Sequence, residues 1–280
     1  MNHLLRELAP ISSSGWDLLD QEARDRLTPA LAARRLVDFT GPHGWEHSAT
    51  NLGRTEALAE APSAGVSGLR RRVLPLVELR AGFELPRAEL RDADRGADDA
   101  DLGPLDEAAH RLAAAENVAV LHGWQGATGG VTESTPHGAI ALGPSPEAYP
   151  QALAAAVELL LQNGIGGPYG VALGSEQYRA AIETAEHGGY PLLKHLGKIA
   201  GGPIVWAPGV AGAVVLSLRG GDFVFDSGQD VSIGYDSHDG EAVRLYLEES
   251  FSFHVATPEA AVALTAAATP ARRRAARRTR

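Results

Sequence analysis

The sequence predicts a mixed α+β fold in which long antiparallel strands support several helices. The first observation is residues 242–256, where apolar and polar side chains alternate, which is the pattern of a strand with one buried face. The second is helical spacing of apolar residues at 14–33, 104–123 and 150–163. The third is that the middle of the chain alternates helix-like and strand-like segments. The 280 residues suffice for one large or two ordinary domains.

The segment 242–256 is the most regular part of the chain. Its odd positions are apolar except for Glu249, and its even positions are mostly polar. We therefore expect one buried face and one more hydrated face. Segments 223–226 and 231–235 alternate in the same way, and turn-forming residues follow them at 227–228 and 237–240. This pattern predicts a meander of antiparallel strands.

The N-terminal part is predicted to hold one helix and two extended arms. Residues 14–33 have helical spacing, and Pro29 should bend or break the helix. Residues 45–85 form two extended arms around a polar bend at 63–68. Because two strands alone enclose little core, arms of this kind usually need a neighbour on which to pack.

The remainder of the chain is predicted to alternate helices with short strands. Residues 86–102 are acidic and turn-like, and a long helix at 104–123 follows, with Pro104 in its first turn. After a loose, glycine-rich stretch at 124–145, a helix at 150–163 ends at Gly164. The later expected elements are a strand at 169–173, a helix at 175–186 with Ser175 as its N-cap, a glycine loop at 186–190, a helix at 191–200, and strands at 203–208 and 213–218.

Composition excludes several classes of protein. The chain has no cysteine, so disulfides, zinc–thiolate sites, iron–sulfur clusters and thiol nucleophiles are excluded. No run of about 18 apolar residues is present to span a membrane, and the N-terminus does not resemble a signal peptide. We therefore expect a cytoplasmic protein.

Charge is distributed unevenly along the chain. The net charge is −10, but the last nine residues contain six arginines; without them, 19 basic residues face 35 acidic ones, a charge of −16. Such an acidic body does not attract nucleic acid. The arginine-rich tail could do so, although a run of like charges is usually disordered and solvated.

Several short motifs suggest chemistry that their surroundings do not support. Residues 43–47 match H-x-x-E-H, but zinc proteases carry this motif on a helix, and the glycines and the proline at 41–44 favour a loop. Asp236, His238 and Asp239 fall in an expected turn, without a nucleophile motif. The acidic cluster at 92–101 fails the calcium-loop pattern, and Gly126, Gly129 and Gly130 lack P-loop spacing. We assign no catalytic residue and no metal site.

Three C-terminal segments, RGGDF at 219–223, GQDVSIGY at 228–235 and VRLYLEESFSF at 243–253, resemble the encapsulins, which are bacterial nanocompartment shell proteins. Further segments agree in the same order, and the resemblance covers residues 1 to about 265. These segments are LAP at 8–10, RRLVDFTGPHGWEH at 34–47, LPLVELRAGFEL at 74–85, GPYGVAL at 167–173 and HGGYPLLKHL at 187–196. The resemblance implies the capsid fold of the Hong Kong 97 phage type.

The same resemblance implies a domain plan. It places an N-terminal helix and arm at 1–44, an extended loop that clasps the next subunit at 45–85, and an axial domain at 124–219. A peripheral domain with a spine helix is implied at 86–123 and 220–265. The remaining residues, 266–280, are expected to form a disordered arginine-rich tail, which the family does not explain.

Site residues are also implied by the resemblance alone. A C-terminal targeting peptide of the cargo docks in an inward-facing groove at Leu27, Arg34, Val37, Asp38, Asp230, Val231 and Ile233; Leu27, Val231 and Ile233 could equally be plain core residues. A fivefold pore is implied at Glu186, His187, Gly188, Gly189 and Tyr190, where an ordinary turn is the alternative. Some family members hold a flavin beside a tryptophan, but Arg87 stands at the candidate position here, so we expect no cofactor.

The implied function is that of a non-enzymatic shell protein. About 60 copies would close into an icosahedral compartment around a dye-decolorising peroxidase or a ferritin-like iron-storage protein. A phage-type capsid protein that packages nucleic acid is the alternative, because it shares the fold. The acidic body disfavours this alternative, and the arginine-rich tail leaves it open.

Overall fold

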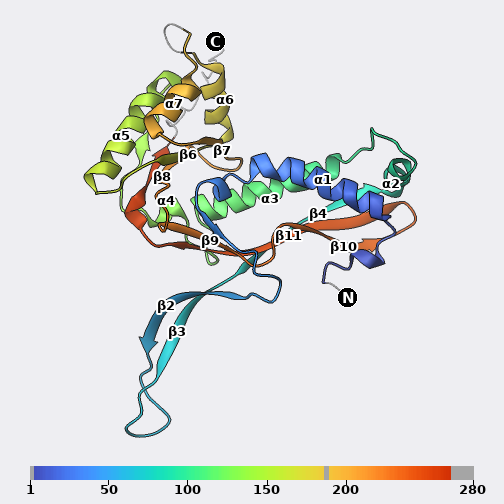
Figure 1. Cartoon of the computed structure of the whole chain (residues 1–280), viewed down its shortest axis with the longest axis horizontal. Coiled ribbons are helices and arrows are strands. Elements are labelled where there is room, and N and C mark those ends of the chain that lie inside the picture. Colours follow the sequence, from blue (N-terminus) through green and yellow to red (C-terminus); the bar gives the residue numbers. More distant parts are fainter. Residues whose placement is uncertain (1–2, 186–188, 266–280) are drawn as a thin grey trace, which may run out of the picture.

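The computed structural model describes residues 3–185 and 189–265. Two five-stranded sheets form the body, and a two-stranded hairpin projects from it (Figure 1). Short 3₁₀ helices lie at Arg6–Leu8, Ala33–Arg35, Pro146–Ala148 and Pro258–Ala260. Within the described residues, no helix is long and apolar enough to cross a membrane.

The first sheet is built around β11 (Ala242–Val255), the longest strand. One edge of β11 pairs along residues 242–251 with β4 (Val77–Pro86). Its other edge pairs with β10 (Ser232–His238) and β9 (Phe223–Ser227), and β1 (Asp38–Thr40) runs parallel to β9. Because β9 pairs with 251–255 and β10 with 243–248, the two strands lie end to end rather than side by side.

The predicted meander is therefore wrong at residues 227–228. The chain continues along β11 there, and Gly228 donates its N–H to the Ser250 carbonyl. A Cβ at Gly228 would lie 2.5 Å from a Leu76 methyl carbon and 2.6 Å from Ser250 Oγ. Glycine is thus required by close packing, and the reversal occurs only at 238–242, where Asp239 Oδ1 accepts the backbone N–H groups of Glu241 and Ala242.

Both faces of β11 are buried, contrary to the expectation of one hydrated face. The even residues Tyr246, Glu248, Ser250 and Ser252 are at most 5% exposed. Polar contacts within the fold accompany this burial: Arg80 donates to Glu248 Oε2 at 2.6 Å and lies over the Tyr246 ring. The alternation fixes which face is apolar, but the polar face is covered as well.

Helices α1 (Ser13–Ala30) and α3 (Gly103–Leu121) lie side by side along the first sheet (Figure 1). Ser12 Oγ caps α1 by accepting the Gly15 N–H at 2.9 Å, and α1 ends one residue after Pro29. Residues 87–94 were expected to be turn-like but form helix α2 (Arg87–Asp94). Leu90, which is 5% exposed, packs in the core and anchors this otherwise polar helix.

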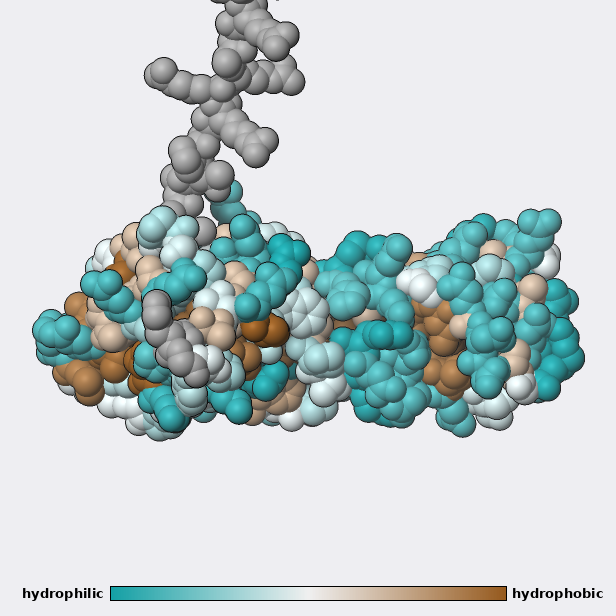
Figure 2. Space-filling view, turned by 90° about the horizontal axis from the view of Figure 1, so that it is seen from above, coloured by the Kyte–Doolittle hydropathy of each residue, from teal (hydrophilic) through white to brown (hydrophobic). Residues whose placement is uncertain are grey.

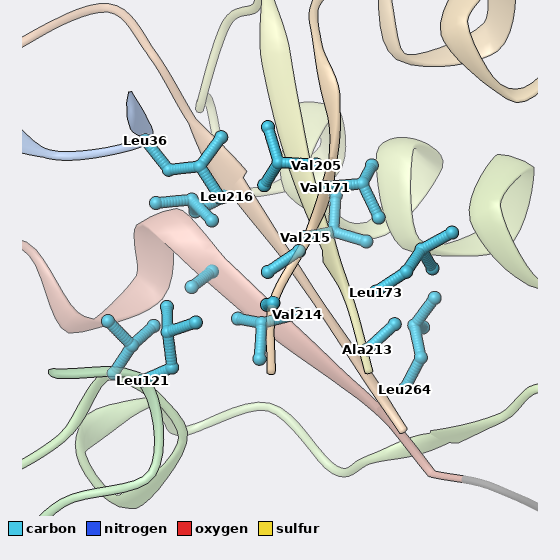
Figure 3. Close-up of a cluster of buried hydrophobic side chains, with 14 of the residues drawn as sticks. Leu36, Leu121, Val171, Leu173, Val205, Ala213, Val214, Val215, Leu216 and Leu264 are labelled. Carbon is cyan, nitrogen blue, oxygen red and sulfur yellow. The ribbon is translucent and has the colours of Figure 1, made fainter. Parts of the chain in front are cut away.

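The second sheet has the order β5 (Ile140–Ala141), β12 (Ala261–Thr265), β8 (Ala213–Ser217), β6 (Tyr169–Leu173), β7 (Ile204–Trp206). Apolar side chains from its strands pack together, as in Figure 3. Helices α4 (Val131–Ser134), α5 (Tyr149–Gln162), α6 (Ser175–Glu183) and α7 (Leu192–Ala200) complete this part. The predicted N-cap is corrected: Gly174 caps α6, and Ser175 Oγ instead accepts the Trp206 indole N–H.

The buried side chains form two hydrophobic clusters. The first contains the second sheet with the C-terminal part of β11, and the second lies between α1, α3, β4 and the N-terminal part of β11. Seen from above, the surface is largely hydrophilic, with smaller hydrophobic spots between (Figure 2). Among the described residues, α3, β11 and the segment around 30–36 contribute fully buried side chains to both clusters, so these elements connect the two parts of the molecule.

The projecting hairpin consists of β2 (Ala49–Ala57) and β3 (Leu69–Pro75), paired antiparallel (Figure 1). It is shorter than the expected 45–85 unit, because 77–86 pairs with β11 in the body. Its distal apolar side chains are exposed: Leu58 by 41%, Val66 by 60% and Leu69 by 66%. These side chains have no core of their own to enter.

Replacement of Phe251 by alanine should destabilise the fold. Phe251 is fully buried and stacks on Phe225 with ring centroids 4.7 Å apart. We expect the Phe251→Ala variant to lose about 3–5 kcal/mol of unfolding free energy, measured by denaturant titration. Leu161→Ala is the control, because Leu161 is 58% exposed and should change stability by less than about 0.5 kcal/mol. Equal effects of the two substitutions would contradict the assigned core.

Candidate functional site

A groove of about 470 Å³ lies between α1 and the start of β10. Five of the seven residues predicted for cargo docking line it, namely Leu27, Arg34, Asp230, Val231 and Ile233. The other lining residues come mainly from α1, and they are Arg6, Asp20, Ala23, Arg24, Thr28, Leu31, Ser232 and Leu247. The groove therefore has an apolar floor and a charged rim.

The floor of the groove is the edge of the second hydrophobic cluster. Leu27, Ile233 and Leu247 belong to that cluster and are 6%, 2% and 0% exposed. Val231 is only partly buried and packs against the same cluster. Leu27 and Ile233 are thus core residues whose surfaces also form the floor, and Val231 is the apolar side chain most open to a ligand.

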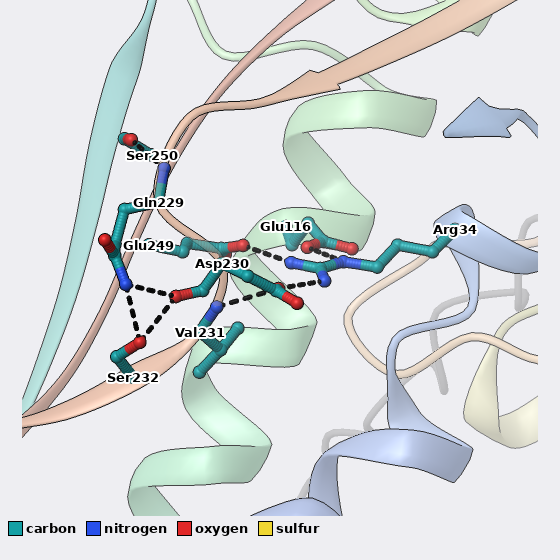
Figure 4. Close-up of polar contacts among 8 residues, drawn as sticks. All are labelled: Arg34, Glu116, Gln229, Asp230, Val231, Ser232, Glu249 and Ser250. Carbon is teal, nitrogen blue, oxygen red and sulfur yellow. Dashed lines mark hydrogen bonds and ion pairs between the residues drawn. The ribbon is translucent and has the colours of Figure 1, made fainter. Parts of the chain in front are cut away.

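Arg34 forms the inner end of the groove and is fully engaged with carboxylates (Figure 4). Its Nε donates to Glu116 Oε2 at 2.7 Å, its Nη1 to Asp230 Oδ1 at 2.6 Å, and its Nη2 to Glu249 Oε2 at 2.6 Å. These partners come from α3, from the β9–β10 connection and from β11. Arg34 therefore positions Asp230, whose own side chain remains 47% exposed at the groove.

The two glutamates that bond Arg34 are buried close together. Burial raises the pKa of Glu249 well above its ordinary value, and the neighbouring charge of Glu116 adds to this effect. Burial likewise raises the pKa of Glu116, opposed by the charge of Arg34. The Oε1 atom of each glutamate is buried, and neither has a hydrogen-bond partner among the described residues. Two buried carboxylates this close oppose each other's ionisation, so retention of one proton by the pair would leave a single negative charge against Arg34.

Val37 and Asp38, also predicted for cargo docking, lie elsewhere. They line a separate hollow of about 200 Å³, together with Gly220 and Phe223. Asp38 Oδ2 accepts the Gly221 N–H at 2.6 Å, which holds the loop before β9. The structure therefore does not bring these two residues to the groove. They follow Arg34 closely in sequence, but Asp38 is already the first residue of β1 (Asp38–Thr40), which leads away from the groove.

The predicted pore segment is described only in part. Glu186, His187 and Gly188 lie outside the described residues. Gly189 has φ of +79°, which favours glycine, and Tyr190 packs edge-on to His195 with Lys198 Nζ 4.8 Å from its ring. Elsewhere, the turn predicted at 236–239 is corrected, because Asp236 and His238 lie in β10 and only Asp239 follows the strand.

The sequence analysis missed the buried acids around Arg34. Glu249 carried a signal, because it interrupts the apolar odd positions of β11. Glu116 gave a weaker signal, because it lies in an alanine-rich helix and its partner Arg34 is 82 positions away. A charge within a buried pattern needs a partner, but the sequence does not identify which arginine supplies it.

Comparison with known proteins identifies close relatives. The family described as "Encapsulating protein for peroxidase" matches residues 1–252. A type 1 encapsulin shell protein of Rhodospirillum rubrum is 49% identical over 272 residues, covering 94% of this chain and 96% of the relative. Those of Mycolicibacterium paratuberculosis and Brevibacterium linens are 41% and 40% identical, covering 95% of this chain and all of each relative.

Solved structures support the capsid fold. A virus-like particle from Pyrococcus furiosus matches with a TM-score of 0.61 at 18% identity, covering 88% of this chain and 98% of that one. The Mycobacterium phage Ogopogo structure matches with a TM-score of 0.52 at 15% identity, covering 84% and 91%. At such low identity the likeness concerns the fold alone, and it confirms the predicted Hong Kong 97-type α+β architecture.

Glu249→Gln should alter how stability depends on pH. From about pH 4.5 upward, the unfolded chain loses a carboxyl proton that the folded pair retains, because the folded pKa is raised. This contribution to stability is complete at low pH and is lost as pH rises through the folded pKa. We expect the glutamine variant to show a shallower decline in urea-unfolding free energy above pH 4.5. Glu78→Gln, at an exposed position, is the control, and an unchanged slope in Glu249→Gln would contradict the raised pKa of Glu249.

Proposed function

This chain belongs to the family of type 1 encapsulin shell proteins, and we propose that its copies close into an icosahedral shell of about 60 subunits around a cargo enzyme. The groove between α1 and β10 is the observation that carries the cargo part of this proposal, because five residues expected there converge on it. We propose no catalytic residue, so the function consists of assembly, docking and controlled access. We place the shell in the cytoplasm.

The hairpin supports the assembly part of the proposal. It extends from the body and exposes Leu58, Val66 and Leu69 at its distal end. Such side chains gain stability when a neighbouring subunit covers them, at about 25 cal/mol per Å² of apolar area. A strand pair that cannot stabilise itself fits a clasp between subunits. Residues 45–85 remain our proposal for the extended loop, with its projecting part at 49–75.

The groove supports docking of an extended peptide. An apolar floor at Leu27 and Ile233 suits aliphatic anchors, and half-buried Val231 lies where such an anchor would enter. Asp230 offers an exposed acceptor, and Arg24 adds positive charge on the rim. Arg34 contributes by holding Asp230, and not by binding the peptide, because its guanidinium already bonds three carboxylates.

The proposed cargo is a dye-decolorising peroxidase or a ferritin-like iron-storage protein carrying a C-terminal targeting peptide. The description of the matching family names peroxidase, which favours the first of these. We propose a peripheral domain at 86–123 with 220–265 and an axial domain at 124–219. The first hydrophobic cluster joins residues of both segments, because Phe223, Phe251 and Phe253 pack with the second sheet. The strand β12 (Ala261–Thr265) also pairs within that sheet, with β8.

Access through the shell is proposed at the loop 186–190. Gly189 supplies backbone freedom there, and Tyr190 lies beside Lys198. No described residue favours a capsid that packages nucleic acid. The net charge of this chain, −10, opposes that function, because nucleic acid is also negatively charged. The arginine-rich tail, 266–280, lies outside the described residues.

Assembly can be tested by electron microscopy of the tag-free protein after size exclusion. We expect uniform hollow particles, and the triple variant Leu58→Asp, Val66→Asp, Leu69→Asp should shift most of the protein to small oligomers, because three apolar contacts become charged. Thr55→Asp is the control, since it adds a charge to the same hairpin at an exposed polar position. A wild-type chain that elutes at 29.3 kDa would contradict the shell proposal.

Docking can be tested by co-expression with a dye-decolorising peroxidase, with and without its C-terminal peptide. We expect Val231→Asp to reduce loading at least tenfold while shells still form, because a charge replaces the apolar contact in the groove. The control Val157→Asp alters another half-buried valine, on α5, far from the groove in sequence. Equal cargo loading of Val231→Asp and wild-type shells would show that the groove is not the docking site. If shells also load cargo that lacks its C-terminal peptide, this peptide does not direct docking.

A further inference from the structure

Two histidines and an aspartate meet at the base of the projecting hairpin. His43 and His47 lie in the loop between β1 and β2, and Asp226 lies in β9. His43 Nε2 is 2.8 Å from Asp226 Oδ1, and His47 Nε2 is 3.0 Å from Asp226 Oδ2. One ligand atom from each of the three residues lies within 4.8 Å of the others. The docking groove and the buried glutamates involve none of these side chains.

The backbone around the histidines is held in place. His43 donates its N–H to the Ser227 carbonyl at 2.9 Å, and Gly44 donates to the Gly228 carbonyl at 2.8 Å. Gly41 has φ of +97°, and a Cβ there would lie 2.4 Å from the Ser227 carbonyl oxygen. The loop is therefore fixed against the end of β9, and both imidazoles are directed to the same carboxylate.

The carboxylate is oriented by further hydrogen bonds. Thr40 Oγ1 donates to Asp226 Oδ1 at 2.8 Å, and Thr50 Oγ1 donates to Asp226 Oδ2. Burial would raise the pKa of Asp226, but these hydrogen bonds and the histidines outweigh it and lower the pKa to about 2. Hydrogen bonds of this kind orient ligating carboxylates in metal sites. Asp226 is thus ionised at neutral pH, and its side chain is only 8% exposed.

We propose that His43, His47 and Asp226 form a binding site for a divalent transition-metal ion of the zinc type. Imidazole and carboxylate are ligands that zinc accepts, with bonds of about 2.0–2.2 Å, so tetrahedral ligand atoms lie about 3.3 Å apart. The two histidine–carboxylate distances are 2.8 and 3.0 Å, to different oxygens of Asp226, and one ligand atom from each residue lies within 4.8 Å of the others. Small side-chain rotations therefore bring three donors around one ion. Binding of the ion at the two Nε2 atoms releases any proton held there to solvent, and water completes the coordination.

The surroundings provide a path for the ion. The side chain of His43 is 46% exposed and that of His47 is 27% exposed, so the site opens to solvent on the histidine side. This arrangement differs from the helical H-x-x-E-H sites that the same residues resemble in sequence. The third ligand comes from a strand 179 positions after His47. A bound ion would tie the loop that precedes β2 to β9, and so fix the base of the hairpin.

The test uses tag-free, assembled, full-length protein stripped with a chelator and dialysed. Zinc is titrated by calorimetry, and bound metal is counted by mass spectrometry after desalting. We expect one zinc ion per chain in the wild type, and a loss of affinity of at least tenfold in both His43→Ala and His47→Ala. His137→Ala is the matched control, because His137 lies elsewhere and its Nε2 bonds the Glu259 carbonyl.

The outcomes separate a metal site from a simple hydrogen-bonded cluster. If His137→Ala still binds zinc and His43→Ala does not, the proposed metal site is supported. Absence of stoichiometric zinc in the wild type, or equal zinc in the wild type and in His43→Ala, overturns it. His43 is the more exposed histidine, so its variant should fold and assemble even if His47→Ala does not. Added chelator should lower the Tm of the zinc-loaded wild type and leave that of His43→Ala unchanged.

Discussion

The buried guanidinium of Arg34 is the contact on which both parts of the molecule depend. Along α3 the second hydrophobic cluster ends at Ala113 and the first begins at Ala119, and Glu116 lies between them. Along β11 the corresponding boundary falls between Leu247 and Phe251, and Glu249 lies between them. Arg34 bonds both glutamates, so the charged groups lie at the boundary between two apolar cores. Asn117 extends this boundary by bonding the backbone of Ala30, Ala33 and Pro208.

A buried ion network of this kind is weak evidence for stability, because desolvation offsets much of its attraction. Its value here is geometric. Hydrophobic contacts are non-directional, whereas three directed hydrogen bonds from one planar group fix the relative positions of α3, β11 and the β9–β10 connection. The same group holds Asp230, and Asp230 precedes the groove residue Val231. The shape of the groove therefore depends on the boundary between the two cores.

The sequence predicted elements whose signal is local, and it failed where the partner is distant. Helices α1, α3 and α5 and the strand β11 appear within a few residues of their predicted bounds, because periodicity is a property of the segment itself. The end-to-end arrangement of β9 and β10 depends on which part of β11 each one pairs with, and no local pattern encodes that choice. Helix α2 was missed because Leu90 alone supplies its buried contact. For the groove, the resemblance supplied five residues, but it did not separate Val37 and Asp38 from them.

The geometry of the hairpin explains why its base needs close control. A strand of nine residues such as β2 is about 30 Å long at about 3.3 Å per residue, so a tilt of about 5° at the base moves the distal end by about 2–3 Å. That displacement is more than half of a van der Waals contact distance of about 3.5–4.0 Å, enough to misplace an apolar side chain in the proposed contact with a neighbouring subunit. The loop at 41–48 is therefore bonded to β9 by its backbone and by both histidines. In the proposed clasp, a site that fastens this loop would act where a small tilt displaces the distal apolar side chains.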